Sequence, residues 1–275
     1  MRETAITFIG GGNMATSLIG GLLDTGVPAE KITVSDPDSN PLAATKFQIK
    51  CCTDNIQAIE NAGVVVLAVK PQTLPEVAKT LATAIPAQLP LFISIAAGIR
   101  IDDIARWLGV HHNLPIVRVM PNTPALVGSA ASALFAGKHV MQSHRELAEN
   151  ILRAVGLTLW VEKESFLDAV TAVSGTGPAY FFYMMEVLEK SAINLGLSQE
   201  TARLLTLQTA FGAAKMALES EEDASTLRAR VTSKGGTTER ALSELEKGGL
   251  QNLFDQAVQA AYQRAVEIAK QFGEQ

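Results

Sequence analysis

Thr4-Ala-Ile-Thr-Phe-Ile9, followed at once by Gly10-Gly-Gly12-Asn-Met-Ala15, sets the architecture of this chain. The first six residues are rich in β-branched and aromatic side chains, which is typical of a strand, and residues 16–23 have the pattern of a helix. The glycines between them carry the spacing G-x-G-x-x-A. Gly10 permits the tight turn, Gly12 lets the backbone approach a pyrophosphate, and Ala15 lets helix and strand pack closely. A glycine-rich corner that binds nothing is the alternative for this spacing on its own.

Further predicted strands follow at residues 31–35, 63–69, 91–95 and 116–119. The nearly unbroken β-branched run from Gly63 to Val69 is typical of a parallel strand that is covered on both faces. Helical patterns, for example at 73–84 and 102–108, alternate with these strands. The sequence therefore predicts a doubly wound parallel sheet of the Rossmann type for residues 1–163.

Ligands bind such a sheet at the loops that follow the carboxyl ends of its strands. Small or polar residues occupy five of these loops: Gly10–Ala15, Ser35–Asp36, Ala68–Pro71, Ala96–Gly98 and Met120–Thr123. Together they predict a dinucleotide site. An acidic side chain in the place of Asp36 accepts hydrogen bonds from ribose hydroxyls and repels the extra phosphate of NADP. An aspartate before a proline is also a common turn pattern.

From Ser165 onward the strand patterns stop, and the sequence predicts an all-α domain for residues 164–275, with helices at 168–172, 179–195, 199–218 and 250–271. The helix at 179–195 is apolar nearly all round. A small helical domain has too little interior to bury such a helix on every side. We therefore predict a homodimer formed through this domain, with assembly into a larger homo-oligomer left open.

A second glycine run, Val231-Thr-Ser-Lys-Gly-Gly-Thr-Thr238, precedes a predicted helix that begins at about Glu239. Free N–H groups and the positive dipole end of a helix N-terminus suit a small anion such as a carboxylate. An ordinary capped helix start is the alternative.

Composition excludes several classes of partner. The 275 residues carry a formal net charge of −5, so nucleic acid and anionic membranes are not expected to bind. We predict no membrane span. Cys51 and Cys52 are adjacent, which does not suit a disulfide, and free thiols indicate the cytoplasm. The four histidines, at 111, 112, 139 and 144, have no ligand spacing typical of a metal site, and no metal is expected.

Four segments of the chain resemble the pyrroline-5-carboxylate reductase family. They are residues 231–246, Ala68-Val-Lys-Pro71, Met120-Pro-Asn-Thr-Pro-Ala125 and Ser174-Gly-Thr-Gly-Pro-Ala-Tyr180. The resemblance runs in the correct order from about Ile6 to the final helix. It implies the last step of proline biosynthesis, in which a hydride passes from NADPH or NADH to the C=N bond of 1-pyrroline-5-carboxylate and gives L-proline.

The resemblance also implies roles for single residues. In the substrate site, the loop of Ser233, Gly235, Gly236 and Thr237 would hold the carboxylate, the catalytic Thr238 would hydrogen-bond the ring nitrogen, and Glu164 would lie near the ring. The implied cofactor residues are Gly10, Gly11, Gly12, Asn13, Met14, Asn55, Ala68, Val69, Lys70, Pro71, Ala96, Ala97, Gly98 and Arg230. Ser35, Asp36 and Asn122 join them from the ends of strands. Lys70 has an alternative as a simple electrostatic contact of a cofactor phosphate.

The chemistry agrees with this interpretation. A cyclic imine is basic enough to carry a proton before the hydride arrives, so the site needs positioning and exclusion of water more than a strong general acid. Two departures from the family pattern stand out. Lys234 replaces the usual proline before the glycine pair, and Asp36 puts the usual preference for NADPH in doubt.

Two other functions remain as alternatives. A β-hydroxyacid dehydrogenase would need a lysine soon after the Gly175-Thr-Gly177 turn, but the first lysine there is Lys190. A dinucleotide-binding redox sensor without catalysis would have a degenerate substrate loop, whereas Gly235–Thr238 is intact.

Overall fold

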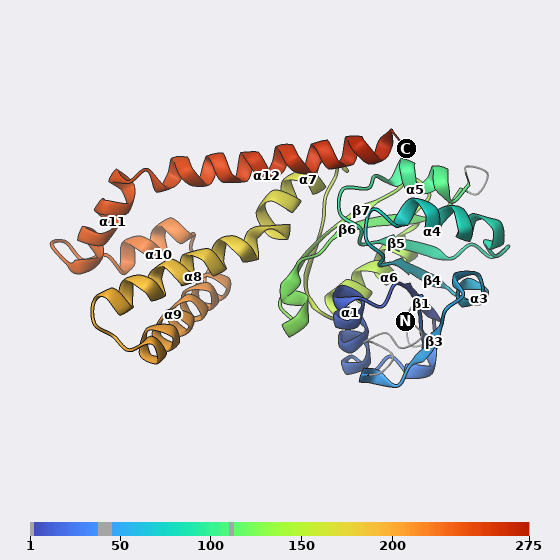
Figure 1. Cartoon of the computed structure of the whole chain (residues 1–275), viewed down its shortest axis with the longest axis horizontal. Helices are drawn as coiled ribbons and strands as arrows, with labels where there is room; N and C mark the ends of the chain where they lie inside the picture. Colours follow the sequence, from blue (N-terminus) through green and yellow to red (C-terminus); the bar gives the residue numbers. More distant parts are fainter. Residues whose placement is uncertain (1–2, 38–45, 110–112, 275) are drawn as a thin grey trace. The chain divides into compact units, whose positions relative to one another are not determined.

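The protein is described by a computed structural model that covers residues 3–37, 46–109 and 113–274. It divides into two compact units (Figure 1). The first consists of Met1–Thr176 together with Ala261–Gln275, and the second of Gly177–Ala260. The boundary that we expect between residues 163 and 164 stays a prediction, since the first compact unit continues to Thr176 and also takes up the end of the last helix.

An eight-stranded sheet forms the centre of the first unit, in the order β3-β2-β1-β4-β5-β6-β7-β8. Its strands are β1 (Ile6–Ile9), β2 (Ile32–Ser35), β3 (Lys50–Cys52), β4 (Val64–Leu67), β5 (Leu91–Ser94), β6 (Ile116–Met120), β7 (Ala130–Ala136) and β8 (Gly156–Trp160). Neighbouring strands from β3 to β6 are parallel. The strand order reverses at β1, which pairs with both β2 and β4, and this is the switch point at which such sheets bind ligands.

The doubly wound fold is thus confirmed, with one addition at its edge. β7 runs antiparallel to β6, and β8 is parallel to β7. β7 reads Ala-Ala-Ser-Ala-Leu-Phe-Ala, and alanine has a low strand propensity, so the sequence alone does not reveal it.

Helices cover both faces of the sheet because the strands are apolar on both sides. Ile6 and Phe8 of β1 join one core, which α1 (Asn13–Asp24) and α6 (Gln142–Arg153) cover. Ile9 belongs to the opposite core, with α4 (Leu74–Leu81), α5 (Ile101–Trp107) and Phe272. Two shorter helices complete the unit, α3 (Asn55–Ile59) and α7 (Phe166–Val170), and α7 continues as a π-helical turn at Thr171–Gly175.

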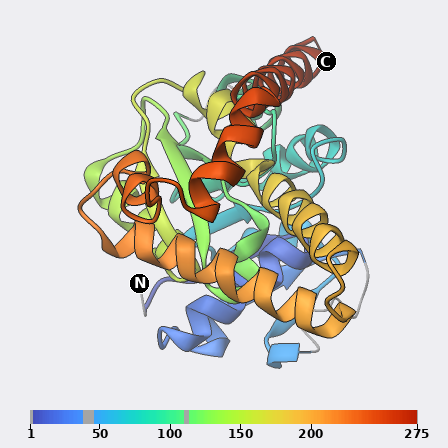
Figure 2. The ribbon, with the colours of Figure 1, turned by 90° about the vertical axis from the view of Figure 1, so that its left-hand side faces the viewer.

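The second unit is helical. It contains α8 (Gly177–Asn194), α9 (Gln199–Glu219), α10 (Ala224–Arg230), α11 (Thr237–Lys247) and the first part of α12 (Leu250–Gly273). A short turn joins α8 to α9, which is clear when the ribbon is viewed from that end (Figure 2). Gly196 makes this turn with φ +98°, and Ser198 caps α9 by accepting the Thr201 N–H at 3.2 Å.

Large apolar side chains lie exposed on α8 and α9 of the single chain. Phe181, Phe182 and Tyr183 are 63%, 65% and 67% exposed. Leu204, Leu205 and Phe211 of α9 are exposed as well. Patches of this kind mark interaction sites. None of the helices in the described part of the chain is long and apolar enough to cross a membrane.

Candidate functional site

The glycine turn after β1 is fixed between two neighbouring strand ends. The Gly10 N–H donates to the Ser35 carbonyl at 2.7 Å, and the Ala68 N–H donates to the Ile9 carbonyl at 2.8 Å. Gly10 has φ +101°, and a Cβ there would lie 2.8 Å from the Ala68 carbonyl oxygen. Only glycine fits this position, because both the conformation and the close approach of β4 exclude a side chain.

Gly12 is a glycine for a different reason. It has φ −70°, which any residue adopts, and no described heavy atom lies within 4 Å of where its Cβ would be. Gly12 is the N-cap of α1, no described side chain caps this end of the helix, and its first turn carries no acidic residue. Open space above uncapped N–H groups at a helix N-terminus is what a pyrophosphate needs. The site therefore fits a dinucleotide.

Polar groups from the ends of β2 and β3 meet the same turn. The Gly11 N–H donates to Oδ2 of Asp36 at 2.7 Å. The Ser35 hydroxyl donates to Oδ1 of Asn55 at 2.7 Å, and Asp54 caps α3 by accepting the Ile56 N–H. The structure thus brings Ser35, Asp36 and Asn55 together beside the glycine turn.

Two further predicted loops follow β4 and β5, the neighbours of β1 on its other side. Ala68 and Val69 are half-buried, while Lys70 is exposed before the start of α4. Gly98 has φ +78°, and its Cβ would lie 2.5 Å from Cγ2 of Ile268, because α12 packs directly on the Ala96–Gly98 loop. These loops lie at the same edge of the sheet as the glycine turn.

The side chain of Asn122 forms hydrogen bonds within the protein. Its Oδ1 accepts the Ala131 N–H at 2.9 Å, and its Nδ2 donates to the Ser174 carbonyl at 3.1 Å and to the Ser174 hydroxyl at 3.3 Å. The amide is 9% exposed and ties the loop after β6 to the π-helical turn. A cofactor contact by Asn122 stays a prediction, and its visible task is structural.

Glu164 is held in a buried ion network. Its Oε1 accepts the Ile101 N–H at 2.8 Å and a proton of Arg118 Nη1 at 3.0 Å. Arg118 is 3% exposed, and its Nη2 lies 3.7 Å from Oδ1 of Asp168, which pairs with Arg100 at 2.8 Å. Glu164 therefore anchors the N-terminus of α5. The sequence reading missed this network, although the charge in the apolar run Ile116-Val-Arg-Val119 indicates a buried partner.

In the second unit, the loop before α11 is ordered by its own groups. Gly235 has φ +72°, and its N–H donates to Oε2 of Glu239 at 2.7 Å. The Gly236 N–H donates to the Ser233 carbonyl at 3.0 Å. The first bond within the helix runs from the Arg240 N–H to the Gly236 carbonyl. The N–H groups of Thr237, Thr238 and Glu239 precede it and are the donors that this end of the helix presents.

Charged groups flank this loop. Arg230, at the end of α10, forms an ion pair with Glu222. Asp223 caps the start of the same helix, and the hydrogen bond from the Thr226 N–H lowers the pKa of its carboxyl. Lys234 is exposed next to Gly235, so its positive charge lies close to an anion bound at this loop.

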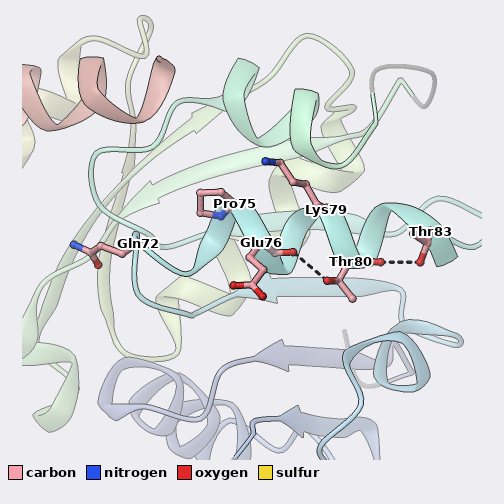
Figure 3. A pocket seen from close by; sticks show the side chains of 6 residues that line it. All are labelled: Gln72, Pro75, Glu76, Lys79, Thr80 and Thr83. Atoms are coloured by element: carbon pink, nitrogen blue, oxygen red, sulfur yellow. Dashed lines mark hydrogen bonds between the residues drawn. The ribbon is translucent and has the colours of Figure 1, made fainter. Parts of the chain in front are cut away.

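The surface of the first unit also has a hollow beside α4. Figure 3 shows its lining residues, Gln72, Pro75, Glu76, Lys79, Thr80 and Thr83, all from α4 or the turns beside it. The Thr80 and Thr83 hydroxyls donate to carbonyls of the same helical segment. Within the described residues, no three His, Cys, Asp or Glu side chains gather as a metal site, and His111 and His112 lie outside them.

Comparison with known proteins covers both units. A family model described as pyrroline-5-carboxylate reductase dimerisation matches residues 164–268, and one described as NADP oxidoreductase, coenzyme F420-dependent, matches residues 5–98. The chain is 49% identical to a pyrroline-5-carboxylate reductase of Pseudomonas aeruginosa over 276 aligned positions, with 100% of both chains covered. It is 44% identical to the enzyme of the same name from Haemophilus influenzae, covering 99% of this chain and 100% of the other.

Two solved structures are similar over the whole length. A pyrroline-5-carboxylate reductase from Coxiella burnetii has a TM-score of 0.91 at 45% identity, with 97% of this chain and 98% of the other covered. The Plasmodium falciparum pyrroline carboxylate reductase with NADP bound has a TM-score of 0.87 at 28% identity, with 98% and 99% covered.

Proposed function

The chain belongs to the pyrroline-5-carboxylate reductase family, and we propose that it reduces the C=N bond of 1-pyrroline-5-carboxylate to give L-proline. NADPH or NADH supplies the hydride. The observation that carries the proposal is the intact loop Ser233–Thr238, which presents backbone donors at the start of α11. The full-length similarity to reductases of that name supports it.

The cofactor pyrophosphate would lie over Gly12 and the first N–H groups of α1. Gly12 leaves the space, and the helix dipole favours the negative charge. The adenosine ribose would lie beside Asp36, Ser35 and Asn55, while the loops Ala68–Pro71 and Ala96–Gly98 would line the other side. In the second unit, Arg230 would reach a cofactor phosphate by leaving its pair with Glu222.

The substrate carboxylate would be held by the N–H groups of Thr237, Thr238 and Glu239. Gly235 and Gly236 would serve by shaping the loop, since their N–H groups are already bonded to Glu239 and Ser233. The Thr238 hydroxyl would hydrogen-bond the ring nitrogen and is the catalytic residue of this proposal. By orienting the ring, the Thr238 hydroxyl would lower the entropic part of the activation barrier. It would not need to donate a proton, because the imine nitrogen is already protonated.

A homodimer is the form in which the site would be complete. We place the subunit contact on the exposed apolar residues of α8 and α9, since the matching family model is one of dimerisation. The substrate loop of one subunit would then serve the cofactor of its partner. The thiols of Cys51 and Cys52 form no disulfide, which supports a cytoplasmic site of action.

The test is the initial rate of NADH and NADPH oxidation by the purified protein with 1-pyrroline-5-carboxylate. Thr238→Ala removes one hydrogen bond to a charged group, about 1.5–3 kcal/mol, and should lower kcat/KM about ten- to hundredfold. Thr80→Ala makes the same chemical change on the exposed face of α4 and serves as the control. Absence of turnover in folded protein that still binds cofactor would overturn the proposal, and would leave a hydroxyacid substrate or a sensor role.

A further inference from the structure

We infer that Arg100 is a positioning residue for the hydride transfer, because its pair with Asp168 fixes the loop Ala96–Gly98 after β5. The inference rests on the proposed function, since this loop would face the nicotinamide of the cofactor. Arg100 would act through the backbone of that loop and would not need to touch cofactor or substrate.

The place of the loop in the sheet assigns it to the nicotinamide end. In the order β2-β1-β4-β5, three strand spacings, or about 14 Å, separate β2 from β5. A dinucleotide crosses the switch point of such a sheet. Since the adenosine ribose would lie at the end of β2, the nicotinamide would lie over the ends of β4 and β5.

The loop is largely packed into the protein. Gly98 and Ile99 are buried, whereas Ala97 is half-buried. A cofactor would therefore meet the loop through few atoms, and a shift of its backbone would move all of them together.

Two acidic side chains hold the residues that follow the loop. Nη2 of Arg100 donates to Oδ2 of Asp168 at 2.8 Å, and the Ile101 N–H donates to Oε1 of Glu164 at 2.8 Å. The Asp168 side chain is 2% exposed and that of Arg100 is 33% exposed. Arg100 is thus tethered to a carboxylate that the surrounding protein keeps in place.

The charges around Asp168 show what Arg100 contributes. Nη1 of Arg118 lies 3.0 Å from Oε1 of Glu164, while Nη2 lies 3.7 Å from Oδ1 of Asp168. One buried arginine is thus shared by two carboxylates, and Arg100 supplies the second cation. Without Arg100, Asp168 would keep only the longer contact, and the loop would lose its tether to α7.

The same part of the chain also holds the loop after β6. Nδ2 of Asn122 donates to the Ser174 carbonyl at 3.1 Å, and the Ser174 hydroxyl donates to the Ala131 carbonyl at 3.2 Å. α7 and the π-helical turn therefore support the loops of two neighbouring strands. A π-helical turn is rare and frequently marks a functional site.

Titration of the purified protein with NADH and with ADP-ribose tests the inference, because ADP-ribose lacks the nicotinamide. Arg100→Met removes the pair with Asp168 and keeps an unbranched side chain. Its Kd for NADH should rise about three- to tenfold, since binding must now order the loop. Its Kd for ADP-ribose should stay within about twofold of the wild type, which also shows that the variant is folded. Arg100→Lys can keep the single contact with Asp168 and should recover most of the affinity for NADH.

Arg106→Met is the matched control, since Arg106 pairs with Asp103 at 3.0 Å near the other end of α5. Both of its dissociation constants should stay within about twofold of the wild type. The inference would be overturned by an unchanged Kd for NADH in Arg100→Met, by an equal change for both ligands, or by the same selective loss in Arg106→Met. A failure of Arg100→Lys to recover NADH binding would also overturn it.

A single turnover gives a second readout. Enzyme loaded with less than one equivalent of NADH is mixed with excess 1-pyrroline-5-carboxylate, so that the bound cofactor is oxidised once. The first-order rate constant does not depend on the folded fraction, and in Arg100→Met it should fall about ten- to hundredfold. A wild-type rate constant in this variant would overturn the inference. Absence of oxidation by the wild type would instead overturn the proposed function, and the titrations, which need no turnover, would still test Arg100.

Discussion

Gly12→Ala should weaken cofactor binding and leave the stability of the fold nearly unchanged, whereas Gly10→Ala, only two residues away, should destabilise the fold. At Gly12 the new methyl group meets no described atom within 4 Å, and φ −70° suits alanine. The change restricts the unfolded chain, which stabilises a protein by about 0.4–1 kcal/mol. Alanine is, however, a poorer N-cap than glycine, so the free energy of unfolding should stay within about 1 kcal/mol of the wild type. The same methyl group fills the space proposed for the pyrophosphate, so cofactor affinity should fall at least about a hundredfold, or about 2.7 kcal/mol.

Gly10→Ala should damage the fold itself. The Cβ would lie 2.8 Å from the oxygen and 2.9 Å from the carbon of the Ala68 carbonyl group, and 3.0 Å from the Val69 nitrogen. All three are backbone atoms of the half-buried segment that directly follows β4 and is bonded to β1 through the Ala68 N–H, so they cannot move aside easily. Backbone strain at φ +101° costs about 1–3 kcal/mol. The steric overlap adds about 1–3 kcal/mol.

Two measurements on each variant test these expectations for stability and for cofactor affinity. Urea unfolding, followed by tryptophan fluorescence, gives the free energy of unfolding, because Trp107 and Trp160 both lie in the first unit. Titration with cofactor gives the affinity. If Gly12→Ala is destabilised as much as Gly10→Ala, or binds cofactor like the wild type, then the space at Gly12 is not a ligand site and the reasoning is refuted.

Three other substitutions have defined expectations. Arg118→Met removes the cation that pairs with Glu164 and Asp168, and it should lower the free energy of unfolding in urea by about 3–5 kcal/mol. A loss under about 1 kcal/mol would mean that the network is dispensable for stability. Glu239→Ala releases the Gly235 N–H and loosens the substrate loop, so KM for the substrate should rise about two- to thirtyfold with little change in kcat; an unchanged KM would contradict an ordering role. Phe182→Glu places a charge on the exposed apolar surface of α8 and should yield monomers in sedimentation velocity, whereas a persistent dimer would place the subunit contact elsewhere.

Much of the fold could be predicted because its signals are local. Apolar patterns and the residues at element ends predict the glycine turn and most of the elements. These are the strands β1, β2, β4, β5 and β6 and the helices α8, α9 and α12. β3 is three residues long and β7 is rich in alanine, so neither carries a pattern that a short window can detect. Their pairing with the preceding strands, β2 and β6, is seen only in the folded sheet.

The candidate site was harder to predict where partners are distant. The bonds of Asn122 lead to Ser174, and those of Glu164 to Arg118, across 52 and 46 positions of the chain. A polar residue that is committed to such a partner looks, in the sequence, the same as one that is free to bind a ligand. The two glycines of the turn are different, because the G-x-G-x-x-A spacing itself predicts separate roles for them. The structure adds the contacts: the protein crowds Gly10 and leaves Gly12 open.

The last helix gives the first unit an unusual dependence on the order of synthesis. Ala265, Ala269 and Phe272 of α12 are 6%, 2% and 7% exposed, and Phe272 completes a core that otherwise comes from residues 9–116. The ribosome makes those earlier residues first, at about 5–20 residues per second. The nascent domain must therefore wait, with part of its interior uncovered, until Phe272 has left the exit tunnel. During that interval an uncovered apolar surface is a natural target for chaperones.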